Sequence, residues 1–269
     1  MMEQLVLVRY TEIALKGTNR GDFEKALVCN LQRVAEDASQ KRVRVSRSQG
    51  RVFIHTAYDP AFRLVFGVTS LSPAIRVSQD LPAIRDAALQ SIRDSTPQSF
   101  RVSASRSDKG FPYTSPQIER DVGAHIQKHT GTPVRLKEAD IEIGIDISSG
   151  HAHVFTEKIE GAGGLPLGTQ GHATCEIRNP HDELAALLLM RRGVSMTCSG
   201  EESRLVYAFS RGLGKSNDAG AVLARVRGER VPPYRSGEAL DLYPLVGLST
   251  EECESYLNHF RRLADAWTG

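Results

Sequence analysis

The segment Ile-Arg-Asn-Pro-His-Asp-Glu at 177–183 brings together side chains that could do chemistry. His181, Asp182 and Glu183 are residue types that serve as general acids, general bases or metal ligands. Consecutive residues on a helix point in different directions, so at most two of them could converge without help from elsewhere. The competing interpretation is structural: Asn179 or Asp182 caps the helix that follows, and the early carboxylates favour its positive end. We favour the structural interpretation.

Two other spacings suggest chemistry less strongly. His125 and His129 lie one helical turn apart, as in a shared metal site, but the glutamate of H-E-x-x-H is absent and a polar helix face explains the pair. The stretch FSRGLGKS at 209–216 ends like a Walker A motif, yet Phe209 stands where the first glycine should be. We predict neither a metal site nor a Walker A loop.

The cysteines are Cys29, Cys175, Cys198 and Cys253, without a C-x-x-C spacing. Neither a zinc ribbon nor a disulfide framework is predicted, and reduced thiols are the favoured interpretation. A nucleophilic cysteine would need a cation or a helix N-terminus beside it to lower its pKa. These patterns therefore leave the catalytic residues unknown.

The formal net charge of +2 is too near neutral to indicate nucleic acid by itself. The charges are uneven, because residues 41–51 contain five basic and no acidic residues. Between residues 101 and 137 lie further basic side chains that could track phosphates: Arg101, Arg106, Lys109, Arg120, Lys128, Arg135 and Lys137. A solvated basic face without a ligand explains the charge pattern equally well. Aromatic residues make up only 6%, so no base-stacking platform is expected.

The sequence predicts that these side chains are positioned by α+β structure in the first part of the chain and by an α/β unit in the last part. Residues 1–78 predict the order β-α-β-β-α-β of the ferredoxin-like split unit, with a hairpin turning at Gln49-Gly50 and a short helix capped by Asp59. Residues 79–160 predict two helices and three strands, the second helix starting with Ser115 as its cap and two strands meeting around Ser149-Gly150.

The glycine-rich segment 161–170 breaks both periodicities and predicts a linker. Residues 171–269 predict an α/β unit with too few strands for a full doubly wound sheet. Its last helix should be capped by Ser249 or Thr250. No apolar run approaches the roughly 18 residues that span a bilayer, and no signal peptide is recognised at the start, so we expect a cytoplasmic protein without a membrane partner.

Several segments together resemble the tRNA 4-thiouridine synthetase family, called ThiI. They occur in the family's order and are VRYTEIALKGTNRGDFEKAL, FRVSASRSDKGFP, SPQIERDVGAHI, DIEIGIDISSGHAHVFTEKIEGAGGLPLGTQ and LMRRGV. The resemblance covers residues 1 to about 170 and then becomes patchy. It extends to archaeal ThiI-like proteins in which HDEL replaces the family's glycine loop.

The resemblance implies the fold and the partner. It implies a ferredoxin-like domain at 1–78, a THUMP domain at 79–160 that grips the acceptor stem and 3′ end of tRNA, the linker at 161–170, and a PP-loop pyrophosphatase domain at 171–269. This last domain, of the adenine nucleotide alpha hydrolase-like class, is expected to be shortened and degenerate. Family analogy also suggests a homodimer.

The family's phosphate loop reads approximately S-G-G-x-D-S-P and enters a helix ending M-K-R-G. Aligned back from MRRG, the loop positions that follow Ile177 hold Arg178, Asn179, Pro180, His181, Asp182 and Glu183. Pro180 removes a backbone N–H and the bulky side chains replace glycines, while the carboxylates would repel a triphosphate. We therefore predict that the usual ATP site is lost and expect no cofactor.

Two functions remain open. The first is a tRNA-binding protein that uses Arg101, Arg106, Lys109, Arg120 and Lys137 for phosphate contacts and presents tRNA to a separate modifying enzyme. The second is an active tRNA sulfurtransferase that binds ATP and Mg²⁺ in an altered pocket and takes sulfur from a partner donor. Cys175 and Cys198 are then the candidate sulfur carriers.

Overall fold

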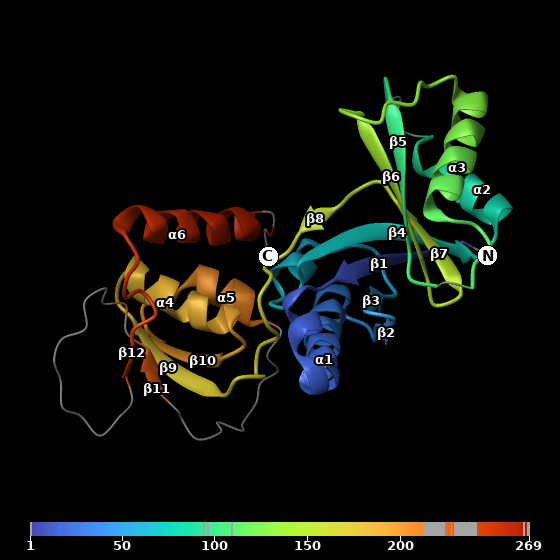
Figure 1. Cartoon of the computed structure of the whole chain (residues 1–269). Coiled ribbons are helices and arrows are strands. Elements are labelled where there is room, and N and C mark those ends of the chain that lie inside the picture. Colours follow the sequence, from blue (N-terminus) through green and yellow to red (C-terminus); the bar gives the residue numbers. More distant parts are fainter. Residues whose placement is uncertain are drawn as a thin grey trace. The chain divides into compact units, whose positions relative to one another are not determined.

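The computed structural model of the 269-residue chain describes residues 2–93, 95, 97–108, 110–211, 224–226, 228, 241–265 and 267. The chain divides into two compact units, each assembled from separate stretches of sequence (Figure 1). Unit 1 contains residues 1–8, 46–58 and 71–159. Unit 2 contains residues 9–45, 59–70 and 160–269.

Unit 1 is built on one mixed sheet with the strand order β2-β3-β1-β4-β7-β6-β5, and β8 pairs with β4. The strands are β1 (Glu3–Arg9), β2 (Val45–Ser48), β3 (Arg51–Ile54), β4 (Ser70–Ser78), β5 (Phe100–Arg106), β6 (Ile141–Ser148), β7 (His151–Phe155) and β8 (Ile159–Glu160). Neighbouring strands run antiparallel in β1–β3, β4–β7 and β6–β7, whereas β5 and β6 are parallel. The strands from the predicted ferredoxin-like and THUMP segments thus share a single sheet.

Two tight turns of this sheet lie where the sequence predicted them. Gln49 and Gly50 both have positive φ, 47° and 76°, and join β2 to β3. Ser149 and Gly150, with φ of 58° and 72°, join β6 to β7. Two-residue hairpin turns with positive φ at both positions match the right-handed twist of the strands they connect, which is why glycine occupies the second position.

Helices α2 (Leu81–Ser91) and α3 (Ser115–Thr130) pack against each other, with α3 on β5 and α2 on β7 (Figure 1). The buried faces of these elements form one apolar core that includes Ile84, Phe100, Ile118 and Ile145.

The predicted cap of α3 is off by one residue. Thr114 has the extended backbone of an N-cap, and its side chain exchanges hydrogen bonds with Gln117 in a capping box, so Ser115 is the first helical residue and Pro116 follows it. Both Thr114 and Ser115 are good capping types, and only the backbone conformation distinguishes them.

In unit 2, a parallel sheet has the order β10-β9-β11-β12. The strands are β9 (His172–Ile177), β10 (Ser195–Gly200), β11 (Ala224–Val226) and β12 (Asp241–Leu242), and the helices are α4 (Pro180–Arg191), α5 (Arg204–Ser210) and α6 (Thr250–Asp265). Helices α4 and α5 lie between the sheet and α6, and α6 packs on both of these helices (Figure 1). The α/β expectation for this part of the chain is confirmed. Ser249 caps α6, since its Oγ accepts the Glu252 N–H at 3.1 Å.

Unit 2 also contains α1 (Arg20–Ser39) and three 3₁₀ helices, η1 (Glu12–Leu15), η2 (Gly17–Asn19) and η3 (Pro60–Leu64). The short helix predicted after Asp59 is η3. Asp59 caps it as expected, because its carboxylate accepts the Ala61 N–H at 2.8 Å.

The glycine-rich segment 161–170, which the sequence predicts as a linker, is packed within unit 2. Ala162, Leu165 and Leu167 are no more than 4% exposed. A Cβ on Gly164 would lie 2.1 Å from the Arg191 carbonyl oxygen, so this close approach requires glycine. Within the described parts of the chain, no helix is both long enough and apolar enough to cross a membrane.

Candidate functional site

The predicted phosphate-loop positions lie where β9 meets α4. Strand β9 ends at Ile177, Asn179 is the N-cap, and α4 begins at Pro180. The Asn179 side-chain oxygen accepts the backbone N–H groups of His181 at 2.9 Å and Asp182 at 3.2 Å. Capping by Asn179 is therefore confirmed. It also satisfies donors that a nucleotide phosphate would otherwise bind at a helix N-terminus.

The Asp182 side chain occupies the centre of this junction and is 2% exposed. Its Oδ2 accepts the Arg178 N–H at 3.1 Å and the Asn179 Nδ2–H at 2.9 Å. Its Oδ1 accepts the Gly228 N–H at 3.1 Å, and the Arg178 Nε lies 3.6 Å from Oδ2. One carboxylate thus joins the end of β9 to the residue two positions after β11.

This junction is the place where an α/β sheet of this topology binds ligands. The chain passes from β9 to β10 on one side and then to β11 on the other, so the strand order switches between β9 and β11. Ligands in such sheets bind in the crevice beyond the carboxyl ends of the strands at the switch point. Here Asp182 lies at that position, and a Cβ on Gly228 would lie 2.5 Å from the Asp182 nitrogen.

His181, Asp182 and Glu183 do not converge. His181 is exposed and Asp182 is buried. Glu183 accepts a hydrogen bond from the Ser203 hydroxyl, which in turn caps α5 by accepting the Val206 N–H at 3.0 Å. The three side chains therefore serve separate local roles, and this geometry gives no paired acid and base.

Two cysteines lie near this junction. Cys175 on β9 is 2% exposed, and its Sγ donates to the Asp182 carbonyl oxygen at 3.6 Å. Cys198 on β10 lies at the surface and lines a cavity of about 600 Å³. Desolvation by its surroundings raises the pKa of the Cys198 thiol to about 11, so this thiol stays protonated near neutral pH.

The five residues of unit 1 that are predicted to contact phosphate differ in whether their cationic groups already have partners in the protein. Arg101 forms an ion pair with Glu142 on the neighbouring strand. Arg106 donates from one guanidinium nitrogen to the carbonyl oxygens of Phe111 at 2.6 Å and Tyr113 at 2.9 Å. Arg101 and Arg106 are five residues apart on β5 and therefore point to opposite faces of the sheet. Lys109 lies outside the described residues.

Arg120 and Lys137 are the more available pair. Both are exposed, and Arg120 donates only to the Pro116 carbonyl oxygen of its own helix, at 3.2 Å. Lys128 and Arg135 are also exposed. Across the described part of unit 1, no carboxylate forms an ion pair with any of these four cations, so their charges remain available to a phosphate.

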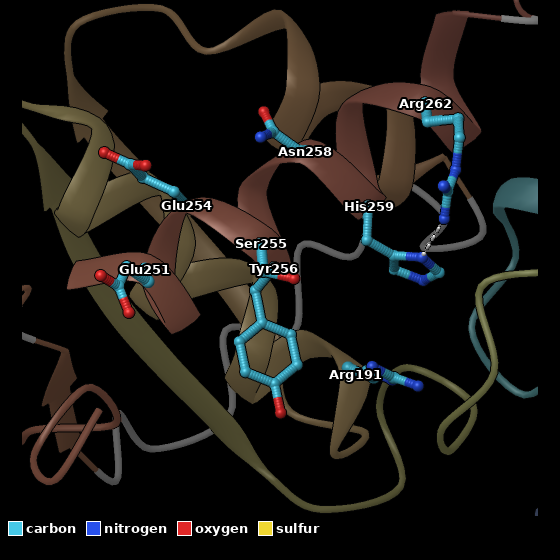
Figure 2. Close-up of a pocket in the computed structure, with 8 residues that line it drawn as sticks. All are labelled: Arg191, Glu251, Glu254, Ser255, Tyr256, Asn258, His259 and Arg262. Carbon is cyan, nitrogen blue, oxygen red and sulfur yellow. Dashed lines mark hydrogen bonds between the residues drawn. The ribbon is translucent and has the colours of Figure 1, made fainter. Parts of the chain in front are cut away.

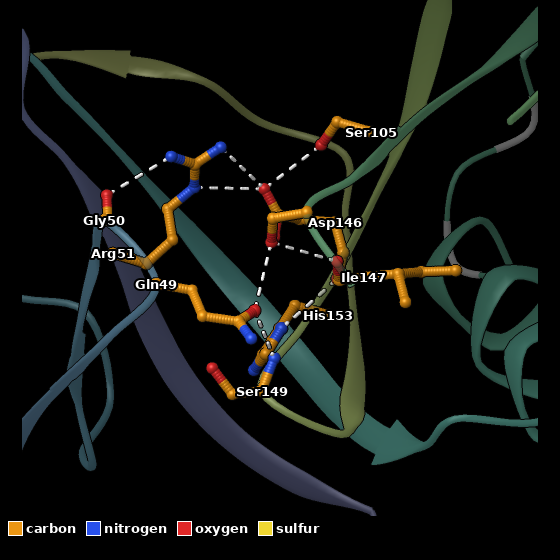
Figure 3. Close-up of polar contacts among 9 residues, drawn as sticks. Gln49, Gly50, Arg51, Ser105, Asp146, Ile147, Ser149 and His153 are labelled. Atoms are coloured by element: carbon orange, nitrogen blue, oxygen red, sulfur yellow. Dashed lines mark hydrogen bonds and ion pairs between the residues drawn. The ribbon is translucent and has the colours of Figure 1, made fainter. Parts of the chain in front are cut away.

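A buried polar cluster in unit 1 was missed by the sequence reasoning. Arg51, beside the β2–β3 turn, reaches Asp146 on β6, with both Nε and Nη2 3.1 Å from the Asp146 Oδ2 (Figure 3). Ser105 Oγ donates to the same oxygen at 3.1 Å. Gln49 Oε1 accepts the Ser149 N–H at 2.9 Å. Because the partners are 95 and 100 residues apart in sequence, no local pattern could reveal them.

His153 on β7 lies beside this cluster and is 2% exposed. Its ring stacks on Phe53 with centroids 4.6 Å apart, and its Nδ1 lies 3.3 Å from the Asp146 carbonyl oxygen. Burial lowers the pKa of His153 to about 4. The side chain is neutral at physiological pH and contributes to packing rather than to charge.

The rings of His125 and His129 lie side by side on α3, with centroids 4.2 Å apart and planes tilted by 38°. The His129 Nδ1 lies 2.7 Å from the His125 carbonyl oxygen. Among the residues with described positions, no cluster of three or more His, Cys, Asp or Glu side chains could hold a metal ion.

Comparison with known proteins places the first two segments in named domain families. Residues 5–72 match the ThiI ferredoxin-like domain, and residues 78–157 match the THUMP domain. A probable tRNA sulfurtransferase of Natranaerobius thermophilus is 36% identical over 243 residues, which cover 83% of this chain and 58% of that protein. A protein of the same name from Thermococcus kodakarensis is 36% identical over 207 residues, covering 72% and 54%. The chain thus spans little more than half the length of these relatives.

Two solved structures resemble the whole chain. PH1313 from Pyrococcus horikoshii has a TM-score of 0.82 and 30% identity, and the match covers 96% of this chain and 99% of that one. A 4-thiouridine synthetase in complex with RNA and bound ATP has a TM-score of 0.76 and 20% identity, covering 99% and 87%. The second likeness shows that the fold is shared. Together with the two domain matches and the curated relatives, these findings show that the chain belongs to the ThiI family of THUMP-domain proteins.

Proposed function

We propose that this protein binds tRNA through the exposed cations of unit 1, as a step in tRNA modification, and that the cradle at the start of α4 takes no nucleotide. The tRNA assignment is supported by the THUMP match, by relatives named probable tRNA sulfurtransferase, and by the shared fold with a synthetase that binds RNA. Arg120 and Lys137 are the residues we assign to phosphate contact. A separate tRNA-modifying enzyme would then act on the bound tRNA.

The buried Asp182 carboxylate carries the second half of the proposal. A phosphate cradle works by aiming backbone N–H groups at an oxyanion, and here the N–H groups of Arg178 and Gly228 already bind this carboxylate. A triphosphate entering the crevice would have to displace Asp182 and would meet its negative charge. Asp182 thus takes the place that an anionic ligand would need.

A tRNA-binding assay across a salt series tests the first half. We expect the wild-type protein to bind tRNA with an affinity that falls as salt rises, because phosphate contacts release counterions. The double variant Arg120→Ala/Lys137→Ala should reduce the slope of log K against log salt by about 1 to 2. Arg93→Ala removes an exposed charge elsewhere in unit 1 and serves as the control. An unchanged slope in the double variant would reject these two contacts.

Calorimetric titration with ATP and Mg²⁺ tests the second half. We expect no binding to the wild-type protein at concentrations where tRNA binds. Detectable ATP binding would reject the proposal that Asp182 closes the site. The tRNA titration of the same preparation shows that the protein is folded and competent, so a negative ATP result is interpretable.

One observation favours the second candidate, an active tRNA sulfurtransferase with an altered ATP pocket and a partner sulfur donor. Cys198 lines the cavity at the end of β10 and could carry sulfur there. Its raised pKa opposes this role, because the thiolate is the nucleophilic form. Isotope exchange between ATP and pyrophosphate, together with thiouridine formation from added sulfide, would establish this candidate. Absence of both activities with intact tRNA binding would leave the first proposal alone.

A further inference from the structure

A groove of about 760 Å³ lies on unit 2, along α6 and beside the last turn of α4 (Figure 2). Seven of its lining side chains come from α6, and Arg191 comes from α4. Apart from Tyr256, the α6 residues follow the three- or four-residue spacing of one helix face, so they form a stripe along the helix. Neither the predicted phosphate loop nor the THUMP segment contributes to this groove.

The stripe has two chemically different ends. Glu251 and Glu254 lie at the N-terminal end of α6, and His259 and Arg262 lie towards its C-terminal end. Eight residues separate Glu254 from Arg262, which corresponds to about 12 Å along a helix. This exceeds the Debye length of about 8 Å at physiological ionic strength, so the acidic end is substantially screened from the basic end.

The basic end brings Arg191, His259 and Arg262 together. Figure 2 shows the His259 ring between the two arginine side chains. An Arg262 guanidinium nitrogen lies 3.3 Å from the His259 Nδ1. On the described residues, no carboxylate forms an ion pair with either guanidinium.

Three arginines and one acid act on the pKa of His259. The pKa is lowered, first by burial and then by the charges of Arg191, Arg262 and Arg63, and the Glu160 carboxylate opposes the shift more strongly than any one of these arginines supports it. Arg63 itself is held by a hydrogen bond to the Glu160 carbonyl oxygen at 3.1 Å.

The position of Arg191 is built into the fold. Its carbonyl oxygen accepts the Leu165 N–H at 2.9 Å, and its guanidinium would lie 3.4 Å from a Cβ on Gly163. The packed glycine-rich segment therefore fixes the end of α4 from which this side chain extends. A cation held in place without an internal partner loses less conformational entropy when it binds an anion.

We propose that the Arg191–His259–Arg262 end of this groove binds a backbone phosphate of the tRNA. Two guanidinium groups offer planar forks of N–H donors that match phosphate oxygens, and the neutral imidazole adds one donor. The carboxylates farther along α6 limit the site to a single phosphate rather than a track. This inference rests on the proposed tRNA binding and adds a contact on the α/β part of the protein.

The test uses the full chain and the same tRNA-binding assay across a salt series. Arg191→Ala/Arg262→Ala should weaken binding about tenfold at physiological salt and reduce the salt slope by about 1, as expected for one lost phosphate contact. Arg261→Ala is the control, because it removes one positive charge from the position next to Arg262 on α6 but does not line the groove. Arg191→Lys/Arg262→Lys keeps the charge without the fork and should lose less than the alanine pair.

The outcomes separate the two proposals. If the wild-type protein does not bind tRNA, both proposals fail. If it binds and the alanine pair behaves like Arg261→Ala, only the groove proposal is overturned. A titration with inorganic phosphate, followed by the His259 ring resonances, covers the remaining source of phosphate. Saturable phosphate binding that the alanine pair abolishes, with tRNA affinity and slope unchanged, would assign the groove to a free anion and overturn the RNA contact.

Discussion

The two ends of α4 differ in whether their polar and charged groups already have partners within the protein. At the N-terminal end, the buried Asp182 carboxylate and the Asn179 side chain accept the backbone N–H groups of Arg178, His181 and Gly228. At the C-terminal end, Arg191 lies beside His259 and Arg262, and the described residues include no carboxylate paired with it. The first end resembles a ligand site in sequence position, and the second does not. The difference predicts that anion binding by this domain depends on unsatisfied groups more than on their place in a motif.

The largest effect should come from Asp182→Asn. The amide presents N–H groups to donors that now bind a carboxylate, so buried N–H groups lose their partner. We expect the free energy of unfolding to fall by about 3 kcal/mol, measured by urea denaturation. Asp265→Asn, at an exposed site on α6, is the control and should change little. A loss below about 0.5 kcal/mol would mean that Asp182 is not the internal partner we describe.

The next effect concerns a buried group that has no ionic partner, His153. Its pKa of about 4 in the folded protein lies below the unfolded value, so the unfolded chain binds the proton first as pH falls. Stability from this group is present above the unfolded pKa and should fall by about 2 kcal/mol between pH 7 and pH 5. Denaturant unfolding curves of wild type and His153→Gln at both pH values isolate the contribution of His153 to the pH dependence of stability. Equal pH dependence in both proteins would contradict the assignment.

Loss of the helix cap should have a smaller effect. Asn179→Ala leaves the N–H groups of His181 and Asp182 without their side-chain acceptor, but water can reach this partly exposed end. We expect a loss of about 1 kcal/mol in the free energy of unfolding. Asn258→Ala, at an exposed position within α6, provides the comparison. Similar values for the two variants would indicate that Asp182 alone organises the start of α4.

The smallest effect should come from the other end of the helix. Arg191→Ala/Arg262→Ala removes no ion pair, so the free energy of unfolding should change by less than about 0.5 kcal/mol per substitution. Thermal and urea unfolding of the double variant measure this directly. A loss of several kcal/mol would show that these arginines are structural, and the contrast between the two ends of α4 would disappear.

Local patterns in the sequence were sufficient for much of the fold. The turns at Gln49-Gly50 and Ser149-Gly150, the caps at Asp59, Asn179 and Ser249, and the change to α/β material are all confirmed. Each depends on interactions between residues a few positions apart, which residue type and spacing describe well. The cap of α3 was misplaced by one residue because neighbouring Thr114 and Ser115 are both suitable.

The candidate sites were harder to predict. Arg101 and Arg106 were grouped by charge, but strand alternation separates them and each already has partners. The segment 161–170 was taken for a linker on composition, yet its apolar residues are buried and its glycines allow close backbone contacts. The groove on α6 was not foreseen, because it depends on a residue of α4 that lies 60 positions or more before its other members.

By itself, the sequence determined the family and the order of its ferredoxin-like and THUMP domains, because these depend on residue identity along the chain. Only the tertiary structure decided which charges are already satisfied. The Asp182 carboxylate accepts the N–H of Gly228, 46 residues away, while no ion pair joins Arg191 or Arg262 to a carboxylate among the described residues. Hydrogen bonds and ion pairs act over a few ångströms in space, and folding alone determines which distant residues come that close.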